Sequence, residues 1–359
     1  MNPDQPNTRA LQAGTNDQTL NALLEQICSL VQSARKTAAT AINSLQVITS
    51  FEIGRMIVEH EQQGAQRAKY GQLVLKTLSD RLTAEFGRGF SKSNLEYMRR
   101  FFLEYRNRAG QIAQMPSGQS PAIFSLSWSQ YIFLLSINNP AERQFYEIES
   151  TTNGWTLPEL SRQFNSSLYE RLALSRNKNE VRRLAQVGQI VSNPKGLMKD
   201  PYVLEFLGID EKATYSESDL ETAIIDKLEH FLLELGKGFL FEARQKRFTF
   251  DDDHFFVDLV FYNRLLRCYV LIDLKIGRLT HQDLGQMQMC VNYFDRYVKT
   301  PDEHPTVGMI LCKQKRKALV ELTLPKDANI HASQYQLYLP SKEDLKQRLM
   351  EWAGEEDEQ

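Results

Sequence analysis

Apolar residues recur at intervals of three and four along the first half of the chain, which is the period of an amphipathic helix. The pattern predicts helices over residues 20–31, 38–60, 73–86, 91–105, 128–136, 141–151 and 168–187. Gly87 provides a C-terminal stop for the third helix, and Ser91 is a good N-cap for the fourth. Residues 1–18 are polar and are expected to be disordered. We therefore predict an all-helical N-terminal domain over residues 19–192.

Apolar runs of strand length replace the helical period beyond Asn193-Pro194-Lys195-Gly196. The pattern predicts a helix over residues 218–235 and another over 282–297. Strands are predicted over residues 239–250, 255–262, 268–276 and 307–312, with one more near 334–339. This order predicts a mixed α/β domain over residues 193–350 that is built on a mixed central sheet. An acidic tail over residues 351–359 follows it.

Composition narrows the class of protein. The chain has 359 residues, of which 42% are apolar and 25% are charged, and its net charge is −2. Because the net charge is close to zero, any surface that binds nucleic acid must be confined to one part of the molecule. The four cysteines contain no CxxC pair, which disfavours a zinc site and suits a reducing compartment. No apolar run approaches the roughly 18 residues of a transmembrane helix. We expect a cytoplasmic protein without a membrane contact or a small-molecule cofactor.

Two neighbouring predicted strands carry charged residues inside apolar runs, namely Asp258 on one strand and Asp273 and Lys275 on the next. A buried charge is costly unless it is paired or coordinates a metal. Residues two apart on a strand point to the same face. A hairpin centred near residue 265 would place Asp258 opposite Ile272, beside Asp273. Two carboxylates at one end of a sheet suit Mg²⁺, and a lysine there can orient water or neutralise a phosphoryl oxygen.

The order helix, strand, strand with Asp258, strand with Asp273-Leu274-Lys275 and helix resembles the core of the PD-(D/E)XK nuclease superfamily. Val257 stands where many members carry a proline. More narrowly, residues 20–345 resemble the bacterial YhcG-like nucleases of this superfamily. The matching stretches are residues 231–239, 258–262, 274–277 and 285–288, together with 70–71, 86–91, 94–95 and Trp128.

This resemblance implies a restriction-endonuclease-like core that hydrolyses DNA phosphodiester bonds with Mg²⁺, for which Mn²⁺ can substitute. Asp258 and Asp273 would hold the metal, and Lys275 would position or activate water. The first helix of such a core usually supplies a glutamate near the metal. Glu221 is the best match, with Glu229 and Glu234 as alternatives.

The helix after the third strand of such cores often supplies a glutamine, and the resemblance assigns this role to Gln288. Gln286 lies about 200° away on an α-helix, so it is not expected to face the same site. The related Q-x-x-x-Y motif is not met, because Tyr293 follows Gln288 one position too late.

The helical half contains a pattern similar to a helix-turn-helix, in which a glycine-rich turn joins the helix that ends at Phe86 to the helix that begins at Ser91. A second such unit covers residues 155–171. The candidate DNA-binding residues on these units and on the first strand are Lys92, Asn94, Arg99, Arg100, Arg162, Arg244 and Lys246. An ordinary helical hairpin would give the same pattern, so DNA binding by this half is a hypothesis.

The sequence predicts a Mg²⁺-dependent DNA endonuclease whose helical N-terminal domain binds DNA. A homodimer is compatible with the sequence. The alternative is a non-catalytic DNA-binding or adaptor protein with a degenerate nuclease fold. The presence of Asp258, Asp273 and Lys275 together favours the enzyme. Repair, restriction and mobile-element defence are the alternative pathways.

Overall fold

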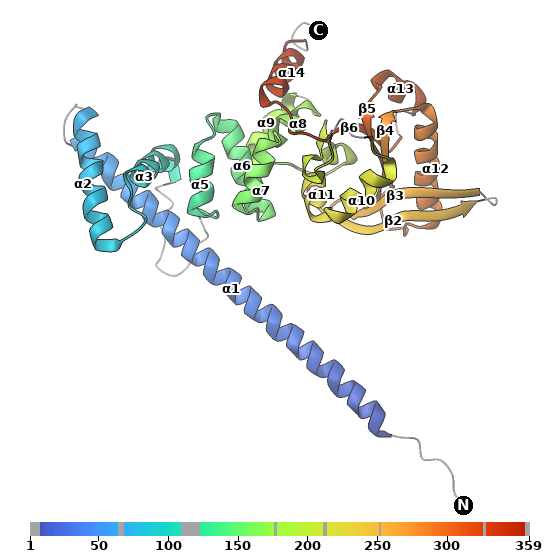
Figure 1. Ribbon diagram of the computed structural model, residues 1–359, viewed down its shortest axis with the longest axis horizontal. Coiled ribbons are helices and arrows are strands. Elements are labelled where there is room, and N and C mark those ends of the chain that lie inside the picture. Colours follow the sequence, from blue (N-terminus) through green and yellow to red (C-terminus); the bar gives the residue numbers. More distant parts are fainter. Residues whose placement is uncertain are drawn as a thin grey trace, which may run out of the picture. The chain divides into compact units, whose positions relative to one another are not determined.

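The chain forms two compact units in its computed structural model, which describes residues 8–63, 68–108, 123–175, 178–210, 214–250, 253–325 and 328–355. The helical unit is Met1–Ser136, and the sheet unit is Ile137–Gln359. The protein is thus of the mixed α/β class that was predicted (Figure 1). The helices between residues 137 and 192, expected with the N-terminal domain, belong to the compact unit that contains the sheet.

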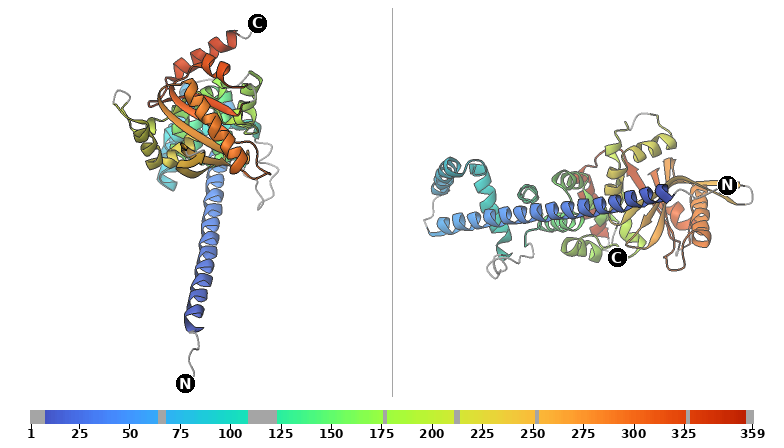
Figure 2. Two further views of the ribbon diagram at one scale, coloured as in Figure 1. Left: turned by 90° about the vertical axis from the view of Figure 1, so that its right-hand side faces the viewer. Right: turned by 90° about the horizontal axis from the view of Figure 1, so that it is seen from below.

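The helical unit begins with a single long helix, α1 (Figure 2). Its helices are α1 (Thr8–Gln63), α2 (Ala68–Phe86), α3 (Lys92–Tyr105), the short η1 (Arg106–Arg108) and α5 (Trp128–Leu135). The sequence predicted two helices in place of α1 and disorder over residues 1–18. No glycine or proline lies between residues 31 and 38, so nothing there ends a helix. Residues 1–7 lie outside the described part of the chain.

The second half of α1 packs against α3 in an aromatic core. The ring of Phe101 lies 6.0 Å from that of Phe51 and 5.0 Å from that of Tyr131, measured between centroids. A Cβ atom on Gly54 would collide with the backbone carbonyl oxygen of Met98. A glycine is therefore needed where the two helices approach most closely.

The sheet unit opens with helices that lead into the α/β core. These elements are α6 (Pro140–Asn153), α7 (Leu157–Asn165), α8 (Leu168–Leu174), α9 (Lys178–Val187), η2 (Pro194–Leu197), η3 (Glu205–Leu207), α10 (Glu217–Asp226) and α11 (Leu228–Leu235). The single helix predicted over residues 218–235 is interrupted at Lys227, whose ψ of 33° is not helical. At the other end of the unit, α14 (Lys342–Glu355) continues into the predicted acidic tail, and residues 356–359 are not described.

Six strands of the described residues form one mixed sheet in the order β1-β6-β5-β4-β3-β2. They are β1 (Tyr202–Val203), β2 (Phe239–Phe250), β3 (Asp253–Asn263), β4 (Cys268–Arg278), β5 (Val307–Gln314) and β6 (Ile330–Gln336). The pairs β2–β3 and β3–β4 are antiparallel, whereas β4, β5, β6 and β1 are parallel. The helix α12 (His281–Tyr297) connects β4 to β5, and α13 (Lys317–Thr323) connects β5 to β6.

Helices cover both faces of this sheet. Leu220 of α10 and Phe231 of α11 pack against one face, in a core that includes Ile272 of β4. On the other face α12, orange in Figure 2, packs Met287 against Leu271 of β4. Burial on both faces explains the continuous apolar runs of these strands. No helix among the described residues is long and apolar enough to cross a membrane.

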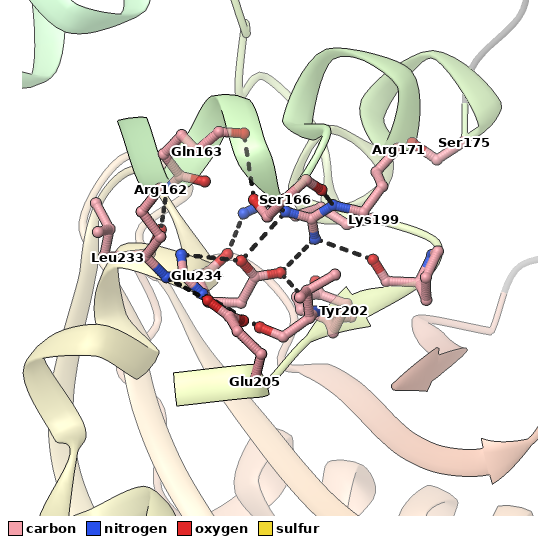
Figure 3. Close-up of polar contacts among 12 residues, drawn as sticks. Arg162, Gln163, Ser166, Arg171, Ser175, Lys199, Tyr202, Glu205, Leu233 and Glu234 are labelled. Atoms are coloured by element: carbon pink, nitrogen blue, oxygen red, sulfur yellow. Dashed lines mark hydrogen bonds and ion pairs between the residues drawn. The ribbon is translucent and has the colours of Figure 1, made fainter. Parts of the chain in front are cut away.

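A buried charge network ties α7 and α8 to α11 (Figure 3). Arg171 and Glu234 are fully buried, and the Nη1 atom of Arg171 lies 2.5 Å from Oε1 of Glu234. Glu234 also accepts the backbone N–H of Val203 at 3.0 Å, and Arg162 lies 3.5 Å from it. The buried ammonium of Lys199 donates to the carbonyl oxygen of Glu234. Burial acts to raise the pKa of Glu234, but the charges of Arg171, Lys199 and Arg162 hold it at about 2. Burial lowers the pKa of Lys199 itself to about 7.

This network predicts that Glu234→Gln destabilises the fold. The substitution leaves buried cations without their counter-ion, which costs about 3–5 kcal/mol of unfolding free energy. The parent should also lose stability in acid, because the folded pKa of about 2 lies below the unfolded value and the contribution of Glu234 disappears as the pH falls through that window. Urea denaturation across this pH range measures both effects.

The control is Glu229→Gln, a substitution of an exposed residue on the same helix. It should leave the unfolding free energy within about 0.5 kcal/mol of the parent. Equal effects of the two substitutions would contradict a special role for the network.

Candidate active site

The antiparallel pairing of β3 and β4 runs from Asn263↔Cys268 to Leu259↔Ile272. At the next position the carboxylate of Asp258 accepts the backbone N–H of Leu274, at 2.8 Å. The side chain thus takes the place of a strand partner where the two strands separate. The register differs by one residue from the predicted one, because Leu259 and not Asp258 pairs with Ile272.

The structure brings Asp258, Asp273 and Lys275 together at this opening. The ammonium of Lys275 lies 3.0 Å from Oδ2 of Asp273 and 3.5 Å from Oε2 of Glu217 on α10. Asp273 is buried, and apart from this ion pair its Oδ2 atom has no hydrogen-bond partner among the described residues. The site therefore carries negative charge that Lys275 compensates only in part.

The electrostatics of the site follow from this crowding. Burial, and then the neighbouring charge of Asp258, raise the pKa of Asp273 to about 7, although Lys275 opposes the shift. Burial acts to lower the pKa of Lys275, but Asp273, Glu217 and Asp258 outweigh it, so the pKa lies above its ordinary value. Lys275 is consequently a cation throughout the neutral pH range. Asp273, in contrast, exists near pH 7 as a mixture of its protonated and ionised forms.

Glu221 lies beside this site and is tied to it by a residue that the sequence analysis missed. The amide of Gln245 donates to Oδ1 of Asp258 at 3.1 Å and to the carboxylate of Glu221. Arg244 donates to the other oxygen of Glu221 at 3.0 Å. Gln245 has a positive φ of 47° and lies opposite Asp258, between the pairs Arg244↔Leu259 and Lys246↔Val257. A glutamine between two basic strand residues gives no sequence signal of this positive φ, so the sequence did not indicate its contact with Asp258.

The acidic groups fit a divalent cation only as a partial ligand set. No three carboxylate, histidine or cysteine side chains within the described ranges converge into a metal-binding group. Asp258 and Asp273 approach each other directly, and their mutual repulsion would be relieved by a cation. Mg²⁺ is commonly held by one or two carboxylates, with water and substrate phosphates as the other ligands. The alternatives for the helix glutamate are not brought here, because Glu234 belongs to the buried network and Glu229 is exposed.

The structure does not bring Gln288 to these residues. Its amide donates to Asn292 at 3.1 Å, and both line a hollow with Pro305 and Asn329 that contains none of the acidic residues of the site. The α12 residue that interacts electrostatically with the site is Cys290. Burial, and then the charge of Asp273, raise the pKa of its thiol to about 12. Gln286 precedes Cys290 by four residues and so lies on the same side of α12. Gln286 is exposed, so its position on this side of α12 does not place it at the site.

Among the predicted DNA contacts of the helical unit, Arg100 is exposed, and Lys92 is exposed and 3.8 Å from Glu96. Arg99 pairs with Glu61 of α1 at 2.6 Å. Asn94 accepts the indole N–H of Trp128 at 2.9 Å, so its side chain connects α3 to α5. This structural contact explains the residue without DNA.

Among those of the sheet unit, Arg162 is unavailable to DNA. Its side chain is only 14% exposed, and it contacts Glu205 and Glu234. The strand residues Arg244 and Lys246 remain accessible, each with a 45% exposed side chain, although Lys246 lies 3.8 Å from Glu242. The candidate DNA-binding residues of this unit thus differ in the structure. Arg162 is held in a buried ion-pair network, whereas Arg244 and Lys246 remain accessible to a ligand.

Comparison with known proteins gives matches along most of the chain. Residues 195–350 match the family described as "YhcG PDDEXK nuclease domain", and residues 26–171 match the "DUF1016 N-terminal domain". The chain is 38% identical over 346 residues to the Escherichia coli (strain K12) protein named "Putative nuclease YhcG", a match that covers 90% of this chain and 92% of that protein.

Two solved structures match the chain more distantly. One is a repair endonuclease from Pyrococcus abyssi, with 16% identity and a TM-score of 0.24. The other is an EndoMS–dsDNA2 complex, with 16% identity and a TM-score of 0.25. Each match covers 37% of this chain and 50% of the other, so the chain spans about half the length of these structures.

The geometry of the site predicts how the pKa of Asp273 in the metal-free protein responds to substitution of Asp258. Asp258→Asn should lower the pKa of Asp273 from about 7, but not to the ordinary value near 3.8, because burial is the larger cause and remains. Since the folded state keeps this proton longer than the unfolded state, the parent should lose stability as the pH rises from about 4 to about 7 and then level off. NMR of the side-chain carboxyl carbons measures the pKa directly.

The control is Asp226→Asn, at an exposed position of α10. It should leave the titration of Asp273 unchanged. A parent Asp273 that titrates near its ordinary value would show that the two carboxylates are neither buried nor coupled as described.

Proposed function

This chain belongs to the YhcG family of PD-(D/E)XK nucleases, and on that premise we propose that it hydrolyses DNA phosphodiester bonds with Mg²⁺ at the site of Asp258, Asp273 and Lys275. The observation that supports this most is the pair of neighbouring carboxylates at the opening between β3 and β4, with a permanent cation beside them. A nuclease fold that serves only as an adaptor has no need of this costly arrangement.

The residues of the site take distinct roles in the proposal. Asp258 and Asp273 hold the divalent ion, which when bound supplies Lewis-acid polarisation of a phosphoryl oxygen and lowers the pKa of water. Lys275 keeps its proton at neutral pH, because its pKa is raised by the carboxylates around it. It therefore donates to a phosphoryl oxygen or orients the attacking water, and does not act as a general base.

Gln245 and Glu221 act on the site through Asp258. The Gln245 amide holds Oδ1 of Asp258, while the backbone N–H of Leu274 holds Oδ2. Glu221 in turn fixes the amide of Gln245 and is itself fixed by Arg244. Glu221 becomes a metal ligand only if the Gln245 amide moves away, so we assign it a positioning role in the conformation described.

The proposal predicts the behaviour of substitutions in a cleavage assay on DNA. Asp258→Ala and Asp273→Ala should abolish cleavage and weaken Mg²⁺ binding, because each removes one of two carboxylate ligands. Lys275→Ala should lower the rate by about 100- to 1,000-fold, the usual effect of removing one electrostatic stabiliser, with Mg²⁺ binding largely kept. Chelation should stop cleavage, and Mn²⁺ should restore it. Single-turnover kinetics and calorimetric metal titration measure these effects.

Gln288→Ala is the matched control, since Gln288 lies on α12 but lines a separate hollow. It should cleave at the parental rate. If Asp273→Ala cut DNA as fast as the parent, the chemistry proposed here would be wrong, and a DNA-binding or adaptor role without catalysis would be the better explanation.

We also propose that DNA contacts the exposed basic residues of both units. In the sheet unit, β2 and β3 pair along residues 239–263, but β3 pairs with β4 only as far as Leu259. The outer part of this hairpin therefore extends beyond the other strands as a two-stranded arm (Figure 1). Lys246 lies at the start of this arm, opposite Val257, and Arg244 lies just before it, where Leu259 still pairs with β4. Phosphate contacts at such residues supply affinity without reading sequence.

The contrast between exposed and buried arginines gives a test of DNA binding. Arg100→Ala should weaken binding and lower the slope of log affinity against log salt by about 1, since one phosphate contact is lost. It should leave Tm unchanged because the side chain is exposed. Fluorescence anisotropy at several salt concentrations, together with thermal unfolding, measures both quantities.

Two arginine variants serve as controls for this test. Arg55→Ala removes a basic residue of α1 that pairs with Glu52 and Glu59, and it should not alter the salt slope. Arg162→Ala should lower Tm through the buried network. A salt slope that is the same for Arg100→Ala as for the parent would remove Arg100 from the DNA surface.

A further inference from the structure

The segment of α1 over residues 23–45 exposes a stripe of large apolar side chains. Their exposed fractions are Leu23 52%, Leu24 60%, Ile27 51%, Leu30 70%, Val31 43% and Leu45 67%. The part of the same helix that follows is different, because Val47 and Phe51 are fully buried within the helical unit. A contiguous apolar stripe of this kind marks an interaction surface in a water-soluble domain.

The stripe follows a seven-residue repeat. Leu23 and Leu30 are seven residues apart, and so are Ile27, Ala34 and Ala41. A third row of apolar residues is formed by Leu24, Val31, Ala38 and Leu45. A repeat of this period, continued over more than three heptads, winds helices around one another in a coiled coil.

We propose that two copies of this chain associate through residues 23–45 of their α1 helices, in a two-stranded coiled coil. This inference rests on the helical unit alone and not on the nuclease site. A second copy is favoured by the residues that flank the stripe, because Gln26, Ser33 and Thr40 carry no charge. Identical helices therefore meet without the like-charge repulsion that sets partner choice in many coiled coils.

The area of the stripe is also adequate for such a pair. A leucine or isoleucine side chain contributes roughly 100 Å² of apolar surface. Six such side chains from each copy, slightly more than half exposed, would remove about 700 Å² of apolar surface from water. With the alanine, serine and threonine residues between them, the contact approaches the roughly 1,000 Å² that a specific interface needs.

Sedimentation velocity of the full chain over a wide concentration range tests the proposal. The parent, whose chain mass is 41.5 kDa, should sediment as a dimer in a concentration-dependent manner. The variant Leu23→Glu/Ile27→Glu/Leu30→Glu should be monomeric, with a dissociation constant raised at least about 100-fold. Circular dichroism and thermal unfolding check that both chains are folded.

The matched control is Ser29→Glu/Gln32→Glu/Ala39→Glu, which adds three charges to exposed positions of the same helix outside the stripe. It should dimerise like the parent. A parent that stays monomeric at every concentration overturns the proposal. In that case, a fall in Tm of the stripe variant would show that the chain's own sheet unit covers the stripe, and binding of the parent to anionic vesicles would show that a membrane does. A stripe variant that dimerises as tightly as the parent also overturns it.

Discussion

The hydrogen bond from the backbone N–H of Leu274 to the carboxylate of Asp258 defines the candidate active site. It ends the pairing of β3 with β4 and satisfies a backbone donor that would otherwise lose its partner at a buried position. The separation of the strands leaves Asp273 and Lys275 at an opening that neither strand closes. The hairpin arm of β2 and β3 and the Gln245 bridge to Glu221 both follow from this separation. The helices α10 and α12 pack on the two faces of the sheet around it.

Charge balance distinguishes this site from the other buried polar cluster of the sheet unit. Around Glu234, the charges of Arg171, Lys199 and Arg162 outweigh the effect of burial, and its pKa is held at about 2. Asp273 is buried and a second carboxylate competes with it for one lysine, so its pKa rises to about 7. A balanced network holds elements together, as Arg171 and Glu234 connect α8 to α11. An unbalanced pair stores electrostatic free energy that a bound cation can release, which is the property expected of a metal-dependent site.

The helical unit shows the same division between structure and surface along one helix. The half of α1 near Phe51 is buried against α3, and Gly54 permits the close approach. The half near Leu30 carries as regular an apolar pattern but is exposed and has no such partner among the described residues of the helical unit. Intrinsic helix propensity alone does not explain why a half-helix of this length is stable without a packing partner. Most helical stability in proteins comes from packing of the apolar face. A second copy of the chain provides the missing packing surface in the association inferred above.

The sequence alone determined the features that depend on local period and residue type. These are the helical first half, the strands on either side of Asp258 and Asp273, and the placement of Lys275 on the face of Asp273. The tertiary structure alone decided which residues meet. It shifted the β3–β4 register by one residue, turned Gln245 toward Asp258 and placed Gln288 outside the site. It also buried Arg162 and used Asn94 to hold Trp128. The physical reason is that period reports only which face of an element is apolar, whereas burial and ion pairing depend on partners tens of residues away.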